Sequence, residues 1–216
     1  MKHKITLSII ALTLLLAPAR SAQNLDGTTS SQVVRRELVK MGEENQKRRQ
    51  EMMDLLSRLP RSNREKAEKK LQQAVERQNA LDSQNRQRLD EIVKEYGWPK
   101  TSVFGNEASG VAFLIVQHAE LEYQKKYFPL IKEAAARNEA RPSDLALLED
   151  SILVGEGKKQ IYGTQARLNR TTQRMELYPI QDEENVDARR AAVGLAPLAH
   201  YLKEAFGIDY IPPKKD

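Results

Sequence analysis

The residues best suited to acid–base chemistry are one histidine and two carboxylates, His118, Asp150 and Glu156. Glu156 lies between Gly155 and Gly157, where a loop with little side-chain bulk can present a carboxylate to a cleft. Paired with His118 or Asp150, it could act as general acid or base in the hydrolysis of a glycan or a peptide. The alternative interpretation is a surface glutamate beside the end of a helix.

His118 follows an apolar run at residues 111–116, so we expect it at the C-terminal end of a buried helix. An imidazole there can serve as a proton shuttle, and the helix dipole is expected to raise its pKa. The alternative is a partly buried histidine that bonds to a nearby carbonyl or carboxylate and takes no part in function.

Neutral polar side chains follow Glu156 closely along the chain. They provide hydrogen-bond donors and acceptors without a nucleophile, which suits a sugar, peptide or amide ligand. The same groups could instead satisfy buried backbone atoms at the start of a hairpin. Asn85, in the polar middle of a long helical pattern, could point into such a pocket or simply be solvated. The candidate ligand-binding residues are therefore Gln160, Tyr162, Thr164, Gln165 and Asn85.

Several common chemistries lack the residues they need. The chain has no cysteine, and His118 and His200 are its histidines beyond residue 22, which leaves no ordinary zinc site. It has no Gly-x-Ser-x-Gly elbow, P-loop, dinucleotide fingerprint or EF-hand loop. We therefore expect no metal and no cofactor.

Residues 1–22 have the pattern of a secretory signal peptide. Lys2 and Lys4 precede an apolar run, and small residues follow it, so cleavage is expected near residues 19–22. The run is shorter than the roughly 20 residues that span a bilayer, so we expect no stable membrane anchor after cleavage; the alternative is that the segment stays uncleaved as an N-terminal anchor. The protein is predicted to be exported, to the periplasm or outside the cell.

The net charge gives little reason to expect nucleic-acid binding. The whole chain carries +5, and the leader accounts for three of the basic residues without any acid, so about +2 remains after its removal. The partner is expected to be an envelope ligand or protein, and the oligomeric state is left open.

The elements that must position these residues are predicted to be mainly helical. A flexible arm and a helical extension occupy residues 23–78, with a first helix from Ser30 or Ser31 that Pro60 stops. A second helix pattern runs over 62–96 and ends at Gly97-Trp98-Pro99, so the pair forms a helical hairpin.

A core helical domain is predicted over residues 79–207, followed by a loose tail at 208–216. A helix buried on every face should follow a loop at 101–105, with Asn106 as its N-cap. Residues 120–137 should form one or two helices, with Pro129 as the start of the second, and another helix should open at Pro142 and end at Gly155 and Gly157. One small β-hairpin is expected between residues 161 and 180, before two short helices.

A series of short motifs resembles a bacterial family catalogued as domain of unknown function 6624. The resemblance covers roughly residues 79–202 and leaves the arm and the first helix outside. It implies a domain with no assigned activity, and Ser151 stands where the family usually has a basic residue after the helix aspartate. The motifs are Gly97-Trp98-Pro99, Gln117-His118-Ala119, Gly157-Lys158-Lys159-Gln160, Tyr162-Gly163-Thr164-Gln165, Pro179-Ile180-Gln181-Asp182, Arg189-Arg190 and Gly194-Leu195.

Two functions from different classes follow from these observations. The favoured one is an exported cell-envelope binding or interaction domain with a polar site around residues 156–165 and His118. The alternative is a hydrolase that uses Glu156 with His118 or Asp150.

Overall fold

The computed structural model describes residues 29–57 and 64–212; the predicted leader, Pro60 and the end of the tail lie outside them. Within that part the protein is mainly α-helical, with seven α-helices and one two-stranded hairpin, which confirms the predicted fold class. No helix among these residues is both long and apolar enough to cross a membrane. The elements are α1 (Ser30–Ser57), α2 (Arg64–Tyr96), α3 (Thr101–Gln117), α4 (Leu121–Ala136), α5 (Pro142–Gly155), β1 (Ala166–Asn169), β2 (Arg174–Leu177), the 3-10 helix η1 (Glu183–Asn185), α6 (Val186–Ala192) and α7 (Leu198–Phe206).

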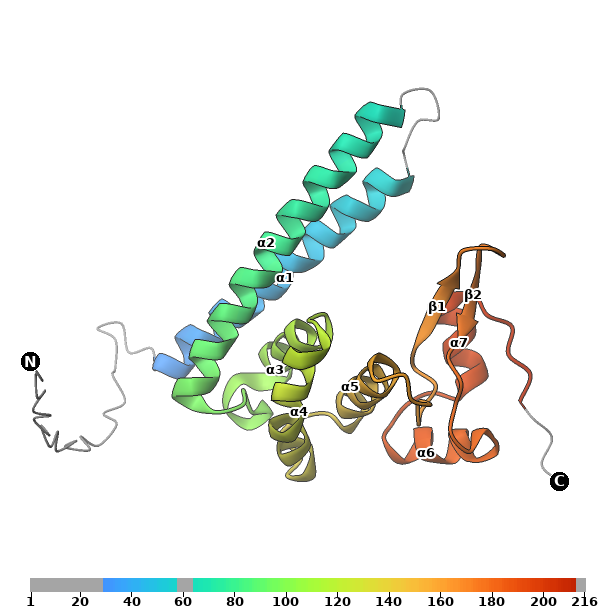
Figure 1. Ribbon diagram of the computed structural model, residues 1–216. Helices are drawn as coiled ribbons and strands as arrows, with labels where there is room; N and C mark the ends of the chain where they lie inside the picture. Colours follow the sequence, from blue (N-terminus) through green and yellow to red (C-terminus); the bar gives the residue numbers. More distant parts are fainter. Residues whose placement is uncertain (1–28, 58–63, 213–216) are drawn as a thin grey trace, which may run out of the picture.

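The two longest helices, α1 and α2, form a hairpin that rises from the rest of the molecule (Figure 1). Its base is part of the main hydrophobic core, where Val34 and Leu38 of α1 pack with Leu89 and Ile92 of α2 and with residues of α3 and α4. Burying one such side chain contributes about 1.5–3 kcal/mol. The predicted extension, 23–78, and the predicted core domain, 79–207, therefore share one core.

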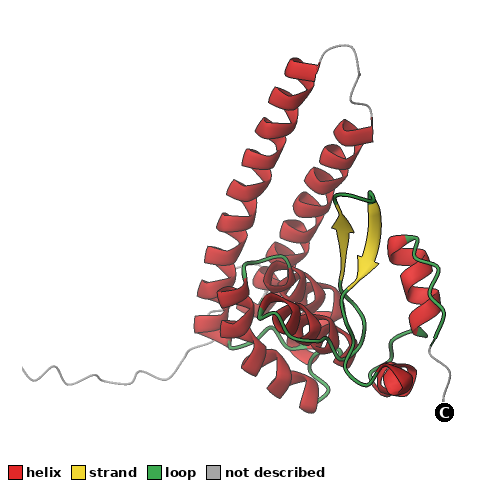
Figure 2. Ribbon diagram, turned by 45° about the vertical axis from the view of Figure 1, so that its right-hand side comes forward, coloured by secondary structure: helices red, strands yellow, loops and turns green. Residues whose placement is uncertain are grey.

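The helices α1 and α3 approach each other closely at Gly42. A Cβ atom at this position would lie 2.4 Å from Cγ2 of Val111, closer than packed carbon atoms come. Glycine is thus required where the two helices touch, and beyond this point the hairpin continues past the end of α3 (Figures 1 and 2).

The start of α3 differs from the prediction. Helical structure begins at Thr101 rather than at Asn106, and Gly105, with φ 78° and ψ 163°, makes a kink inside it. The first turn is stabilised from outside, because the Glu139 carboxylate accepts hydrogen bonds from the backbone N–H of Ser102 (3.0 Å) and from its hydroxyl (2.7 Å). A contact between residues distant in sequence therefore makes a helix from a segment that reads locally as a loop.

The helix α4 is continuous, so the predicted new start at Pro129 is wrong. Proline removes the hydrogen bond to the carbonyl of Lys125, four residues earlier. Pro129 and Lys125 are both exposed, so water can satisfy that carbonyl, and packing of the opposite face keeps the helix intact.

The C-terminal part forms a smaller unit beside α5 (Figure 1). Strands β1 and β2 pair antiparallel with Ala166 opposite Leu177, as the predicted hairpin requires. A second apolar cluster is formed by Ile180, which follows β2, by Val186 of α6 and by Leu198 and Leu202 of α7.

Candidate functional site

Asp150, one of the predicted acid–base residues, is fully buried in α5. Its Oδ1 accepts hydrogen bonds from the backbone N–H groups of Ile161 (2.6 Å) and Tyr162 (3.0 Å). Its Oδ2 accepts from the N–H of Thr164 (3.0 Å) and from the hydroxyl of Thr164 (2.9 Å). An ionised carboxylate has about four acceptor positions. The Asp150 carboxylate is therefore occupied in tying the loop at 160–164 to α5.

The predicted ligand-binding residues of this loop bond mainly to the loop itself. Gln160 is fully buried; its Nε2 donates to the carbonyls of Gln165 (3.1 Å) and Tyr178 (2.7 Å), and its Oε1 accepts from the N–H of Gln165 (2.8 Å). Gln165 in turn donates through its amide to the hydroxyl of Thr164 (3.0 Å). Tyr162 is partly buried, and burial raises the pKa of its phenol. These contacts agree with the alternative interpretation of the sequence, in which the polar side chains satisfy buried backbone atoms.

Glu156 forms two ion pairs at the protein surface. Its carboxylate lies 2.8 Å from the Lys158 ammonium and 3.3 Å from that of Lys125. These two lysines, Lys158 first, hold the pKa of Glu156 below its usual value. Neither His118 nor Asp150 is among its partners in the described part of the chain. A carboxylate held ionised in this way is a poor general acid at neutral pH.

A cavity of about 510 Å³ lies between α1, α2 and α3, and it brings together Asn85 and His118. Part of its wall is apolar, with Val39, Met53, Val111, Leu114 and Ile115 in the lining. The predicted burial of residues 111–116 on every face is wrong at Leu114, whose side chain lines the cavity and is 47% exposed. An apolar cavity wall with polar groups at one end is the usual form of a small-molecule site.

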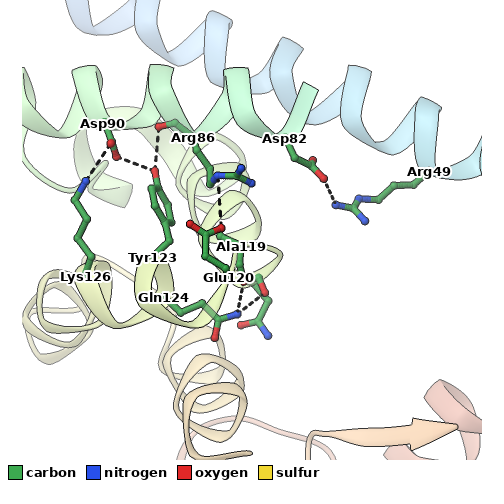
Figure 3. A network of polar contacts seen from close by, with 10 residues as sticks. Arg49, Asp82, Arg86, Asp90, Ala119, Glu120, Tyr123, Gln124 and Lys126 are labelled. Carbon is green, nitrogen blue, oxygen red and sulfur yellow. Dashed lines mark hydrogen bonds and ion pairs between the residues drawn. The ribbon is translucent and has the colours of Figure 1, made fainter. Parts of the chain in front are cut away.

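The polar end of the cavity is built around Asp82, which α2 presents towards α1 (Figure 3). Oδ1 of Asp82 accepts from the amides of Asn45 and Gln78, each at 2.8 Å. Oδ2 accepts from Nη2 of Arg49 at 3.4 Å, and Nε of Arg49 also donates to Asn45 (2.6 Å). Three donors thus bond to this carboxylate, and Arg49 among them offsets its charge.

Two further residues of α2, Arg86 and Asn85, lie at the polar end and have donor groups with weak or missing hydrogen-bond partners. Arg86 lies 3.8 Å from Glu120, a carboxylate that is 63% exposed (Figure 3). Asn85 is 5% exposed, and its Nδ2 has no hydrogen-bond partner among the described residues. An unpaired buried polar atom costs about 1–3 kcal/mol, and ligand sites are one place where this cost is tolerated.

His118 contributes a neutral imidazole to the cavity, in contrast to the prediction. Its side chain is still exposed, yet partial desolvation by the surrounding residues lowers its pKa, and the nearby positive charge of Arg49 lowers it further. Asp82 acts in the opposite direction but is outweighed. The expected rise from the end of α3 is therefore wrong, because partial desolvation dominates over the helix dipole. A neutral imidazole offers one donor and one acceptor.

Asn45, Arg49, Asp82 and Arg86 were not among the predicted site residues. The polar middle of the second helix pattern was visible in the sequence at Gln78 and Asn85, but the facing charged stretch of α1 read as a solvated surface. Opposed polar layers in both arms of a helical hairpin are the signal that could have identified this end of the cavity.

No group of histidine, cysteine, aspartate and glutamate side chains in the described residues is placed to hold a metal ion. A family model described as a family of unknown function (DUF6624) matches residues 32–210. No curated protein matches the chain, and no solved structure matches it. The match includes almost all of α1, which the resemblance in the sequence had left outside.

Proposed function

The chain belongs to this family of unknown function, and we propose that it is a ligand-binding module of the cell envelope, with its site in the cavity between α1, α2 and α3. The exported location rests on the leader pattern of residues 1–22. The observation that carries the binding role is the cavity itself, where an apolar wall meets the polar end formed by Asn45, Arg49, Asp82, Asn85, Arg86 and His118.

The chemistry of the lining favours binding over catalysis. The described residues around the cavity include no serine, threonine, cysteine or lysine, the usual covalent nucleophiles. The partly buried carboxylate of Asp82 already accepts three hydrogen bonds. His118 is left as a neutral hydrogen-bonding group without a carboxylate partner bonded to its ring among the described contacts.

The hydrolase alternative has weaker support. It needs Glu156 to act with His118 or Asp150, whereas Glu156 is paired with Lys158 and Lys125 and the Asp150 carboxylate is filled by donors from the 160–164 loop. Cleavage of a glycan or peptide substrate by the purified protein, abolished in Glu156→Gln, would favour the hydrolase instead.

The binding role can be tested by screening small molecules for a rise in the melting temperature of the purified protein. A ligand at a hundred times its Kd adds about 2.7 kcal/mol to the free energy of unfolding, which such a screen detects readily. The rise in melting temperature that each hit causes is then measured again in Leu114→Trp. The larger side chain fills the cavity, and Leu114 is already 47% exposed, so the fold should accept it.

The matched control is Val103→Trp, on the same helix, 52% exposed and outside the cavity lining. We expect hits to lose their effect in Leu114→Trp and to keep it in Val103→Trp. A screen without hits, or hits that stabilise both variants equally, would refute the proposed site.

A further inference from the structure

Resting on that proposed function, we propose that the ligand is a small carboxylate with an apolar body: the carboxylate binds at Arg49 and Arg86, and the body lies along Val111, Leu114 and Ile115 of α3.

The charge at the polar end favours an anion. Two guanidinium groups line it, Arg49 and Arg86, against the single carboxylate of Asp82. His118 adds no positive charge, since partial desolvation and the neighbouring Arg49 lower its pKa. Arg86 faces the carboxylate of Glu120, which is 63% exposed and 3.8 Å away, so the charge of Arg86 is only weakly compensated and suits one ionised carboxylate better than a neutral or cationic group.

The hydrogen bonds at this end lead to the same conclusion, because the arginine N–H groups there are donors that are not all bonded to an acceptor. Arg49 donates through Nε to Asn45 and through Nη2 to Asp82, and its Nη1 bonds to no acceptor in the described part of the chain. Arg86 makes only the 3.8 Å ion pair with the exposed Glu120. Asp82 already accepts from three donors, which use most of its acceptor positions. A guanidinium fork is well matched to the two oxygens of a carboxylate.

The rest of the cavity requires an apolar body. Leu114 and Met53 both line it while remaining 47% and 58% exposed, so a ligand that covers them would remove apolar surface from water. Val39, Val111 and Ile115 continue this surface. A cavity of about 510 Å³ lies within the range of roughly 300–1,000 Å³ that is usual for small-molecule sites.

The test compares molecules that share one chain and differ in the head group: decanoate, decanamide, decylamine and decyl phosphate. Binding to the full protein is measured by isothermal titration calorimetry at neutral pH, below the concentrations at which these molecules aggregate. We expect decanoate to bind about tenfold or more tightly than decanamide, and decylamine not to bind. Decyl phosphate should bind no more tightly than decanoate, because Asp82 and Glu120 already offset part of the charge of Arg49 and Arg86, so a second negative charge gains little.

Two arginine variants test where the carboxylate of the ligand binds. Arg49→Gln and Arg86→Gln should each weaken decanoate about tenfold and leave decanamide unchanged. The control is Arg77→Gln, an exposed arginine of α2 outside the cavity lining, which should alter neither. Melting curves of each variant establish that it is folded before binding is compared.

The outcomes separate this proposal from the one on which it rests. If decanamide, decylamine or decyl phosphate binds as tightly as decanoate or more so, or the two arginine variants bind decanoate normally, the carboxylate assignment is wrong although the cavity still binds ligands. If all four fail while other compounds bind and are blocked by Leu114→Trp, the ligand class is wrong and the binding role stands. If nothing binds in either experiment, both proposals fail.

Discussion

Replacing Asp150 with alanine removes the acceptor for three backbone N–H groups and one hydroxyl, all from the loop at 160–164. A buried donor left without a partner costs about 1–3 kcal/mol, and water entering the space of the lost carboxylate recovers part of this. We therefore expect Asp150→Ala to lower the free energy of unfolding by about 3–5 kcal/mol. Asp150→Asn keeps one acceptor oxygen and should cost about half as much.

Urea denaturation followed by circular dichroism measures the loss, and hydrogen exchange locates it. The amides of Ile161, Tyr162 and Thr164 should lose protection in Asp150→Ala, because they are the donors to this carboxylate. The matched control is Asp209→Asn, a carboxylate that is 83% exposed and paired with Lys203, for which we expect a change within about 0.5 kcal/mol.

The reasoning would be refuted by a loss below about 1 kcal/mol in Asp150→Ala with unchanged protection of the three amides. That result would mean that the second apolar cluster holds the loop without the carboxylate. A rise in stability in Asp150→Asn would have a different meaning: the buried charge would cost more than its hydrogen bonds return.

Three further predictions concern the main core and the cavity. Desolvation and Arg49 lower the pKa of His118 in the folded state, so the neutral imidazole contributes stability above about pH 6.5 that is lost as the pH falls further. Between neutral pH and roughly pH 5, the urea midpoint of His118→Gln should therefore fall less than that of the wild type. Gly42→Ala should destabilise by about 1–3 kcal/mol, since its Cβ would lie 2.4 Å from Val111, and adding Val111→Ala should recover most of the loss in a thermal melt. Asp90→Ala should cost about 1–2 kcal/mol in urea denaturation, because the Tyr127 hydroxyl and Lys126 lose their acceptor while the Tyr123 hydroxyl keeps the Arg86 carbonyl, and a cost near zero would contradict that account.

Much of the architecture was predictable because its signals are local. Glycine at Gly97 and Gly157, each with positive φ, ends α2 and α5 where the sequence placed those ends. The alternation of apolar residues around a polar turn predicted the one hairpin. Such features depend on the conformational preferences of a few neighbouring residues, so a single sequence is sufficient to read them.

The site depended on contacts that no local pattern contains. Asn85 and His118 were singled out separately, and only the crossing of α1 and α3 at Gly42 places both on one cavity with Arg49 and Arg86. The residues of the 160–164 loop looked equally suited to a ligand, yet the buried Asp150 engages their backbone and side chains.

The amino-acid sequence by itself therefore determined the helical class, most element ends and the family resemblance, since propensity, capping and hydrophobic period act over one or two turns. Only the tertiary structure decided which polar groups are occupied and which remain available. That distinction depends on burial and on partners brought from distant parts of the chain: Glu139 gives α3 its first turn, partial desolvation and Arg49 lower the pKa of His118, and Lys158 and Lys125 engage Glu156.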